Sequence, residues 1–406
     1  MADKMDLLDV EVWDGNMAAS QAMRQAQIDV VAAYPITPST PVVENYAGFL
    51  ANNYIDGEFV LVESEHAAMS ACIGASAAGG RVATATSSQG FALMVETLYQ
   101  ASGMRVPIIL NVINRALAAP LNVNGDHSDM YLGRDSGWIQ FNAYNAQDAY
   151  DLNLIAFKVA EDHRVRLPAM IHQDGFMTSH TAEGVLTMPD EEAYAFVGDF
   201  KPMNGMLDFE KPATYGVQTE EDWHFEHKAR QHNDLMTKVF PVIEEVFDAF
   251  EAKTGRRFDL ITNHKLEDAD AVIVAMGTTV DTAMMVADQL RAEGKKVGVL
   301  GLRVIRPFPF EKIVEALSNV KAVCCMDRSS PHGTVGMLYN EFCGAMYNSA
   351  NKPVITNYIY GLGGRDMTVE YLKGIFADGL ANAEAGKPTT PLQQYIGVRG
   401  PKLSFL

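Results

Sequence analysis

Residues 81–104 read RVATATSSQGFALMVETLYQASGM, a β-strand that runs through a short polar turn into an α-helix. The strand is expected from Arg81 to Thr86, the turn at 87–90, and the helix over 91–104. A strand followed directly by a helix is the repeating unit of a parallel α/β sheet, so this stretch decides the fold class.

The same unit recurs through the first 180 residues. Val30–Ala33 is a short apolar strand ended by proline, and Thr37 or Ser39 is expected to cap the helix that begins near Pro41. Further strands are expected at 59–62, 106–113, 138–144 and 167–172, with helices at 66–80 and 147–163. Strands that alternate with helices predict a doubly wound parallel sheet with helices on both faces.

The pattern divides the chain into three regions. Residues 1–180 form the first α/β domain, and 181–265 form a connecting, largely helical region whose long helix is interrupted at Pro241. Strand–helix alternation returns in 266–406, a second α/β domain with a C-terminal tail and strands expected at 271–277, 297–303, 321–327 and 354–361. His224 and His227 lie one helical turn apart, but no third histidine or suitably spaced carboxylate accompanies them. They are therefore expected to face solvent.

The charge balance narrows the possible partners. Of the 406 residues, 51 are acidic and 32 basic, which gives a net charge of −19 and argues against a nucleic-acid-binding surface. No apolar run approaches the ~20 residues needed to cross a bilayer, and the N-terminal segment lacks the basic-then-apolar pattern of a signal peptide. The composition therefore predicts a cytoplasmic protein that binds neither nucleic acid nor membrane.

The four cysteines, Cys72, Cys324, Cys325 and Cys343, show no CxxC spacing and lie in apolar surroundings. They are expected to be buried, reduced thiols. Because an iron–sulfur cluster needs four suitably placed thiolates, no cluster is expected in this chain. No zinc-ligand spacing occurs either, so the sequence predicts no metal site.

Polar residues follow four of the expected strand ends: Thr37, Glu65, the 87–90 turn and Arg115. Ligands of parallel α/β sheets bind outside the carboxyl ends of the strands. The four loops therefore predict a binding site at this edge. Gly361-Leu-Gly-Gly364 does not fit the GxGxxG pattern and follows the last strand, so it is expected to be a tight turn.

Several longer motifs follow one another in order. They are YPITPS (34–39), ESEHAA (63–68), TSSQG (86–90), RALAAP (115–120) and GDHSD (125–129). In residue identity, order and spacing these motifs resemble those of the α subunit of the 2-oxoacid:ferredoxin oxidoreductases. The resemblance runs from about Val10 to Thr181. It resumes from about Ala271 to Thr368, where the chain is similar to the family's transketolase C-terminal-like domain.

The resemblance implies a division of labour among subunits. The first domain would hold the aminopyrimidine ring of thiamine diphosphate, and a β subunit would bind the diphosphate through Mg²⁺. In agreement, this chain lacks a Gly-Asp-Gly segment followed by Asn-Asn, the pattern that binds the Mg-diphosphate. The γ and δ subunits, which are ferredoxin-like, would carry [4Fe–4S] clusters and pass electrons to ferredoxin or flavodoxin.

The implied reaction is the oxidative decarboxylation of pyruvate with coenzyme A. Other 2-oxoacids, including 2-oxoglutarate, branched-chain oxoacids and oxalate, remain open because one methylene changes affinity by only ~1–3 kcal/mol. A transketolase-like carbon transferase and a non-catalytic binding subunit are the alternatives outside this activity.

Glu65 is the residue to which the resemblance gives the clearest role. In this family the matching carboxylate binds the pyrimidine ring nitrogen and favours the 4′-imino tautomer of the cofactor. Glu63, two residues earlier, competes for the role. From its position alone, Glu65 could instead stabilise the start of a helix through the helix dipole.

The resemblance assigns Arg115 to the substrate carboxylate and Thr37 to a hydrogen bond nearby. The competing interpretation of Arg115 is a structural ion pair with Asp126 or Asp129, and that of Thr37 is a helix cap. The cofactor pocket is expected to be lined by Tyr34, Pro35, Ile36, Ser88 and Gln89.

Overall fold

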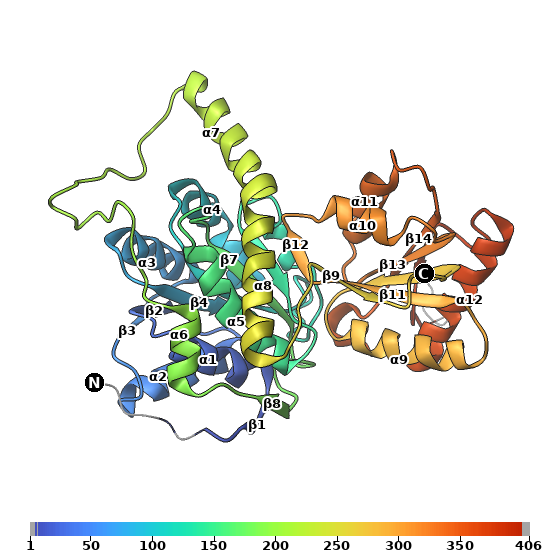
Figure 1. Cartoon of the computed structure of the whole chain (residues 1–406), viewed down its shortest axis with the longest axis horizontal. Coiled ribbons are helices and arrows are strands. Elements are labelled where there is room, and N and C mark those ends of the chain that lie inside the picture. The colour runs from blue at the N-terminus through green and yellow to red at the C-terminus, as the bar shows by residue number, and fades with distance from the viewer. Residues whose placement is uncertain (1–4, 6, 400–406) are drawn as a thin grey trace.

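The computed structural model describes Met5 and residues 7–399. The outermost residues of the two predicted end domains, 1–4, 6 and 400–406, lie outside the described part. Residues 1–4 and 6 also belong to the N-terminal segment that lacks a signal-peptide pattern. The described chain contains two large mixed sheets, each covered by helices on both faces (Figure 1). This confirms the α/β fold class.

The first sheet has seven strands in the order β12-β6-β7-β5-β4-β2-β3. Their bounds are β2 Val30–Ala33, β3 Glu58–Leu61, β4 Val82–Thr86, β5 Ile109–Asn114, β6 Ile139–Asn142, β7 Ala169–Asp174 and β12 Val304–Arg306. All neighbours pair in parallel except β12, which pairs antiparallel with β6. The central strands β4 and β5 are buried throughout because helices cover both of their faces.

Two groups of helices enclose this sheet. One face is covered by α1 (Gly15–Gln25), α2 (Thr40–Ala51) and α5 (Ala146–Glu161), and the other by α3 (Glu65–Ala78) and α4 (Ser88–Met104). Small residues allow α3 to pack closely, and the Ser64 hydroxyl accepts the Ala67 N–H at 3.1 Å to cap it.

The start of α2 differs from the prediction. Ser39 stands at the N-cap position, but its hydroxyl donates to the Ile36 carbonyl at 2.8 Å and accepts nothing from the helix. Thr37 lies further upstream. Neither side chain caps the helix, because Pro41 in the first turn has no N–H and removes one of the donors that a cap would satisfy.

The second sheet has six strands in the order β15-β14-β13-β10-β11-β9. Their bounds are β9 Ile261–His264, β10 Ala271–Ala275, β11 Val297–Leu302, β13 Ala322–Asp327, β14 Val354–Ile359 and β15 Gln393–Tyr395. Only β9 runs antiparallel to its neighbour. On one face pack α9 (Thr279–Ala292) and α12 (Val369–Ala385), and on the other α10 (Phe310–Ala316) and α11 (Met337–Met346). β12 follows β11 directly in the chain but pairs with β6 of the first sheet, so it connects the two sheets.

The segment between the sheets begins with β8 (Glu183–Leu186), which pairs antiparallel with β1 (Val10–Trp13), followed by α6 (Asp190–Val197). It ends with α7 (Glu221–Asp234), a π-helical turn at Leu235–Val239, and α8 (Phe240–Thr254). The helix therefore continues past Pro241 instead of breaking, because the wider π turn accommodates a residue without an N–H.

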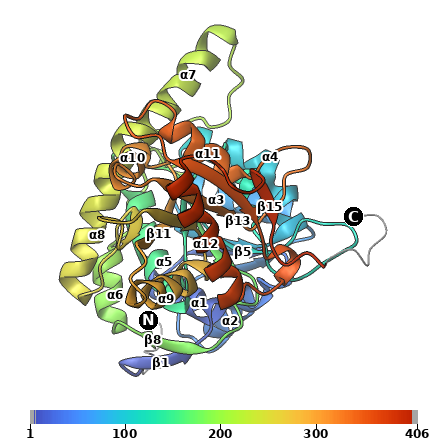
Figure 2. The same cartoon turned by 90° about the vertical axis from the view of Figure 1, so that its right-hand side faces the viewer.

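Residues 201–230, which we call the arm, form a loop and part of α7 that project from the body of the molecule (Figures 1 and 2). The arm contacts the body at Met206, whose N–H donates to the Ala77 carbonyl at 2.8 Å, and at His227, whose Nε2 lies 3.3 Å from the Gly103 carbonyl. Nearly every residue of the arm is exposed, and its large apolar side chains include Phe209, Trp223 and Phe225 at 88%, 71% and 75% exposure. His224 and His227 are exposed on α7 as expected. Within the described residues, no helix is long and apolar enough to cross a membrane.

Candidate active site

The loops after β2, β4 and β5 meet at the carboxyl edge of the first sheet, where the sequence predicts a binding site. The Arg115 guanidinium donates to the Thr37 carbonyl at 2.8 Å, to Gln89 Oε1 at 3.2 Å and to the Asn122 carbonyl at 3.4 Å. Three of the four predicted loops are thus joined by one side chain, which is 6% exposed.

The Arg115 guanidinium has no carboxylate partner within the described part of the chain. The alternative ion pair with Asp126 or Asp129 does not form. Asp126 accepts the Gly363 N–H at 3.1 Å, and the contact between Arg115 and Asp129 is made by the backbone N–H of Arg115, at 3.0 Å, and not by its guanidinium. The cation is therefore held by neutral oxygens and keeps its capacity for an anionic ligand.

Glu65 begins α3 and is 6% exposed, whereas Glu63 is exposed. The Glu65 carboxylate lies against Gly90, where an added Cβ would clash with Oε1 and sit 2.7 Å from Thr86 Oγ1. No hydrogen bond to the Glu65 carboxylate forms among the described residues, and the buried Thr86 and Ser87 hydroxyls also lack partners. The Glu65 carboxylate is thus largely enclosed yet free to accept a hydrogen bond, so this pocket suits a ligand that carries an N–H or O–H.

Ser88 and Gln89 have different surroundings. Ser88 is fully buried with φ of 50°, and its hydroxyl lies 2.6 Å from both Gln89 Oε1 and the Ala116 carbonyl. Gln89 is exposed. The structure therefore directs the Ser88 side chain into the protein, where it orients Gln89, and leaves Gln89 at the surface of the site.

The segment after β2 lies open. Tyr34, Pro35 and Thr37 are exposed and Ile36 is partly buried, while the Pro38 carbonyl accepts the Asn16 side-chain N–H at 2.9 Å. Tyr34, Pro35 and Ile36 thus lie on a largely exposed segment that Asn16 of α1 fixes at Pro38.

The glycine turn after β14 holds the loop that follows Arg115. Besides the bond from Gly363 to Asp126, Gly364 donates to the Gly125 carbonyl at 2.8 Å and the Asn122 amide donates to the Gly363 carbonyl at 3.1 Å. Gly363 and Gly364 have φ of 58° and 82°, and a Cβ on either would collide with the loop. The turn expected from the sequence therefore also has a role in positioning, which its spacing did not reveal.

A buried charged cluster joins the two sheets behind this loop. Asp174 lies 2.6 Å from His127 Nε2 and 2.9 Å from an Arg328 nitrogen, and it accepts the Thr278 N–H and hydroxyl at 3.0 and 2.7 Å. Burial acts to raise the pKa of Asp174, but Arg328 and His127 together hold it well below its usual value. The cluster fixes the second sheet against the candidate site.

Asp129 is a residue whose role the sequence did not predict. It is fully buried and accepts hydrogen bonds from Ser88 N, Asn114 Nδ2 and Arg115 N at 2.8, 2.8 and 3.0 Å. Burial raises the pKa of Asp129 to about 6, while these three hydrogen bonds act to lower it. The GDHSD motif marked the segment, but its residue types do not show which backbone groups the aspartate binds.

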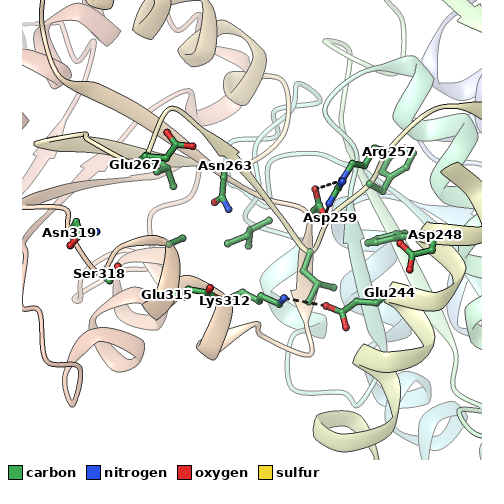
Figure 3. A pocket seen from close by; sticks show the side chains of 16 residues that line it. Glu244, Asp248, Arg257, Asp259, Asn263, Glu267, Lys312, Glu315, Ser318 and Asn319 are labelled. Atoms are coloured by element: carbon green, nitrogen blue, oxygen red, sulfur yellow. Dashed lines mark hydrogen bonds and ion pairs between the residues drawn. The ribbon is translucent and has the colours of Figure 1, made fainter.

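A hollow of about 810 Å³ lies elsewhere, between α8 and the second sheet (Figure 3). Its walls carry the carboxylates of Glu244, Asp248, Asp259, Glu267 and Glu315. Its two cations are already paired, Arg257 with Asp259 and Lys312 with Glu244. Such a surface repels anions and contains none of the candidate residues. No group of three or more possible metal ligands occurs among the described residues.

Comparison with known proteins identifies the family. A family model described as pyruvate flavodoxin/ferredoxin oxidoreductase, thiamine diphosphate-binding, matches residues 21–248, and one described as pyruvate:ferredoxin oxidoreductase core domain II matches 269–372. The chain is 45% identical over 385 residues to pyruvate synthase subunit PorA of Thermotoga maritima, covering 95% of this chain and 97% of the relative. It is 43% identical over 389 residues to ketoisovalerate oxidoreductase subunit VorA of Pyrococcus abyssi, covering 95% and 97%.

Solved structures agree on the fold. The 2-oxoglutarate:ferredoxin oxidoreductase from Magnetococcus marinus superimposes with a TM-score of 0.72 at 21% identity, covering 94% of this chain and 67% of that chain. A split-gene transketolase gives a TM-score of 0.53 at 14% identity, with 91% and 99% covered. The family models and the curated relatives together show that the chain belongs to the pyruvate:ferredoxin (flavodoxin) oxidoreductase family.

Proposed function

We propose that this chain is the α subunit of a cytoplasmic pyruvate:ferredoxin oxidoreductase and supplies the residues that hold the aminopyrimidine of thiamine diphosphate and the substrate carboxylate. The complex would convert pyruvate and coenzyme A to acetyl-CoA and CO₂ and reduce ferredoxin or flavodoxin. The observation that carries the proposal is the largely buried Glu65 side chain, whose carboxylate has no donor among the described residues and which lies at the same sheet edge as the Arg115 cation, itself without a carboxylate partner there.

The residues around Gly90 fit the cofactor's ring. A pyrimidine nitrogen that carries a proton would give Glu65 the donor it lacks, and the absence of a side chain at Gly90 leaves the carboxylate in place. Thiamine diphosphate supplies the carbon nucleophile that attacks the 2-oxo group. Glu65 would hold the ring-nitrogen proton, and the buried wall formed by Thr86 and Ser87 would keep water away from it.

Arg115 would bind the carboxylate common to all 2-oxoacids, with Gln89 and Thr37 holding the guanidinium in place. Pyruvate is the proposed substrate because relatives named pyruvate synthase from Thermotoga maritima and Pyrococcus furiosus are 45% and 42% identical. Ketoisovalerate is the second candidate, since VorA chains are equally similar. Comparing kcat/KM over a panel of 2-oxoacids, with purified complex, decides between them.

We also propose that other subunits complete the site: a β subunit that binds the diphosphate through Mg²⁺, and γ and δ subunits that carry [4Fe–4S] clusters. The relatives are named as subunits, and the edge of the site is open. Large apolar side chains near the candidate residues in the sequence, Tyr34, Leu61, Leu93 and Leu121, are 40%, 68%, 49% and 68% exposed. Exposed apolar side chains of this kind mark surfaces that other proteins cover.

The isolated chain is expected to contain no iron and to leave pyruvate unoxidised, because its cysteines cannot ligate a cluster and the diphosphate pattern is missing. The complex purified through a tag on this chain should contain iron and reduce ferredoxin with pyruvate and coenzyme A. Iron analysis, visible absorbance and activity of both preparations test this. Stoichiometric iron in the single chain would contradict it, and carbon transfer without iron in the complex would favour a transketolase-like activity.

Gly90→Ala is expected to weaken thiamine diphosphate binding to the complex several-fold, because the new Cβ displaces the Glu65 carboxylate. The thermal midpoint should change little, because the gain of about 1 kcal/mol in helix propensity with alanine offsets the cost of the contacts that the new Cβ makes with Glu65 and Thr86. Gly74→Ala is the matched control, for an added Cβ in that helix meets nothing within 4 Å. Cofactor titration by fluorescence measures the effect, and equal affinities of the two variants would place the cofactor elsewhere.

A further inference from the structure

Asp129 connects two loops of the site through a single carboxylate oxygen. Its Oδ2 accepts the backbone N–H of Ser88, at the start of α4, and that of Arg115, just after β5. Its Oδ1 accepts the side-chain N–H of Asn114, the last residue of β5. Ser88 and Arg115, which are 41 and 14 residues from Asp129 in the sequence, are thereby held at one point.

The same two loops are joined a second time by side chains. The Ser88 hydroxyl lies 2.6 Å from Gln89 Oε1, which in turn accepts from the Arg115 guanidinium at 3.2 Å. Asp129, Ser88, Gln89 and Arg115 therefore form a closed ring of contacts. Within this ring Asp129 fixes the backbone from which the guanidinium projects, and it touches neither the guanidinium nor the exposed face of the site.

The need for a carboxylate follows from the partners. All three groups that face Asp129 are donors, and both oxygens must accept, which an ionised carboxylate does and a neutral amide does not. Burial disfavours that ionised form and raises its pKa to about 6. Burying a carboxylate costs free energy that an apolar side chain of the same size would not cost. We therefore expect Asp129 to act through the groups that it orients.

We propose that Asp129 is a positioning residue for substrate binding: by holding the Ser88 and Arg115 backbones it sets the guanidinium for the 2-oxoacid carboxylate. This rests on the proposed function, which assigns the carboxylate to Arg115. Glu65 is not bonded to Asp129, so cofactor binding should depend much less on Asp129 than substrate binding does.

The first test is Asp129→Asn in the assembled complex. An amide at 129 removes the negative charge that the three donors face. Asn114 can turn over its side-chain amide to offer Oδ1 to the new N–H, but a neutral oxygen holds the Ser88 and Arg115 backbone N–H groups more weakly and lets the two loops shift. Displacement of a binding group by a fraction of an ångström is expected to raise the KM for pyruvate about tenfold, with thiamine diphosphate affinity within about twofold of wild type. Binding of oxamate, a non-reacting carboxylate analogue, measured by calorimetry should weaken in parallel.

The rescue variant is Asn114→Asp/Asp129→Asn. Asn114 Oδ1 has no partner within the described residues, so exchanging the two side chains lets the new carboxylate accept from the new amide. The amide oxygen at 129 then accepts both backbone N–H groups, and KM and oxamate affinity should return toward wild type. Asp135→Asn, at an exposed position a few residues further along the same segment, is the control and should change neither value.

If the complex with Asp129→Asn does not assemble, Asp129→Glu replaces it, because glutamate keeps the charge and moves the oxygens by one methylene. The KM for pyruvate should again rise while the affinity for thiamine diphosphate stays near that of wild type. An assembled variant with wild-type KM and oxamate affinity overturns the inference. So does one in which the thermal midpoint, cofactor affinity and KM change together, since that is the behaviour of a scaffold. A wild-type complex that oxidises no 2-oxoacid would instead overturn the proposed function.

Discussion

Glu65→Gln is expected to lower turnover of the complex by roughly a hundred- to ten-thousandfold, the range over which a positioned acid–base group contributes. Glutamine fills the same space but is neutral, so it cannot stabilise a protonated pyrimidine nitrogen as a carboxylate does. Proton exchange at the thiazolium carbon of bound thiamine diphosphate, followed by NMR, should slow with turnover. The thermal midpoint should stay near that of wild type, because the Glu65 carboxylate has no bond in the described chain that glutamine would break.

Glu63→Gln is the matched control. Glu63 is exposed two residues earlier, so its substitution should leave both proton exchange and turnover close to wild type. The opposite result, with exchange lost in Glu63→Gln and kept in Glu65→Gln, would mean that the role belongs to the other glutamate and that the burial of Glu65 serves only the helix start.

Arg115→Ala should reduce kcat/KM for pyruvate by about ten- to a hundredfold, because a hydrogen bond to a charged group contributes about 1.5–3 kcal/mol. Thiamine diphosphate affinity should remain nearly unchanged, since Arg115 has no contact with Glu65. Arg115→Lys should recover only part of the loss, because an ammonium keeps the charge without the planar fork that matches a carboxylate.

The stability of Arg115→Ala separates substrate binding from scaffolding. The guanidinium pairs with neither Asp126 nor Asp129, so its removal leaves no buried carboxylate without its cation, and the thermal midpoint should fall only modestly. Arg134→Ala, which removes a guanidinium paired with Asp135 further along the same segment, serves as the control. A strongly destabilised Arg115→Ala whose folded fraction keeps the wild-type KM would make Arg115 a structural residue.

The strand–helix alternation predicted the α/β class and most strands of both sheets, but not β9, β12 or β15, nor the antiparallel pairings that make both sheets mixed. The strand at Val30–Ala33 was placed correctly to the residue, and the loops carrying Thr37, Gln89 and Arg115 do meet. These successes have a common cause: apolar runs, prolines and glycines act on their immediate neighbours, and parallel strands necessarily bring their carboxyl ends together.

Several of the interactions that the sequence did not predict are made with backbone groups of distant segments. Asp129 binds peptide N–H groups, which every residue except proline possesses, so the identity of Ser88 or Arg115 contains no sign of the contact. The turn at Gly363 meets Asp126 across 237 positions of the chain. Likewise, the buried direction of the Ser88 side chain follows from its φ of 50°, which the residue type does not specify.

The arm has a consequence for the colloidal behaviour of the chain. Its exposed apolar side chains, among them Phe209, Trp223 and Phe225, favour self-association, whereas a net charge of −19 makes separate copies repel one another. The repulsion acts through water and is screened over about 10 Å at 0.1 M salt and about 3 Å at 1 M, while apolar attraction is not screened. Added salt therefore shifts the balance toward clustering of uncomplexed chains, and dilute buffer keeps them dispersed.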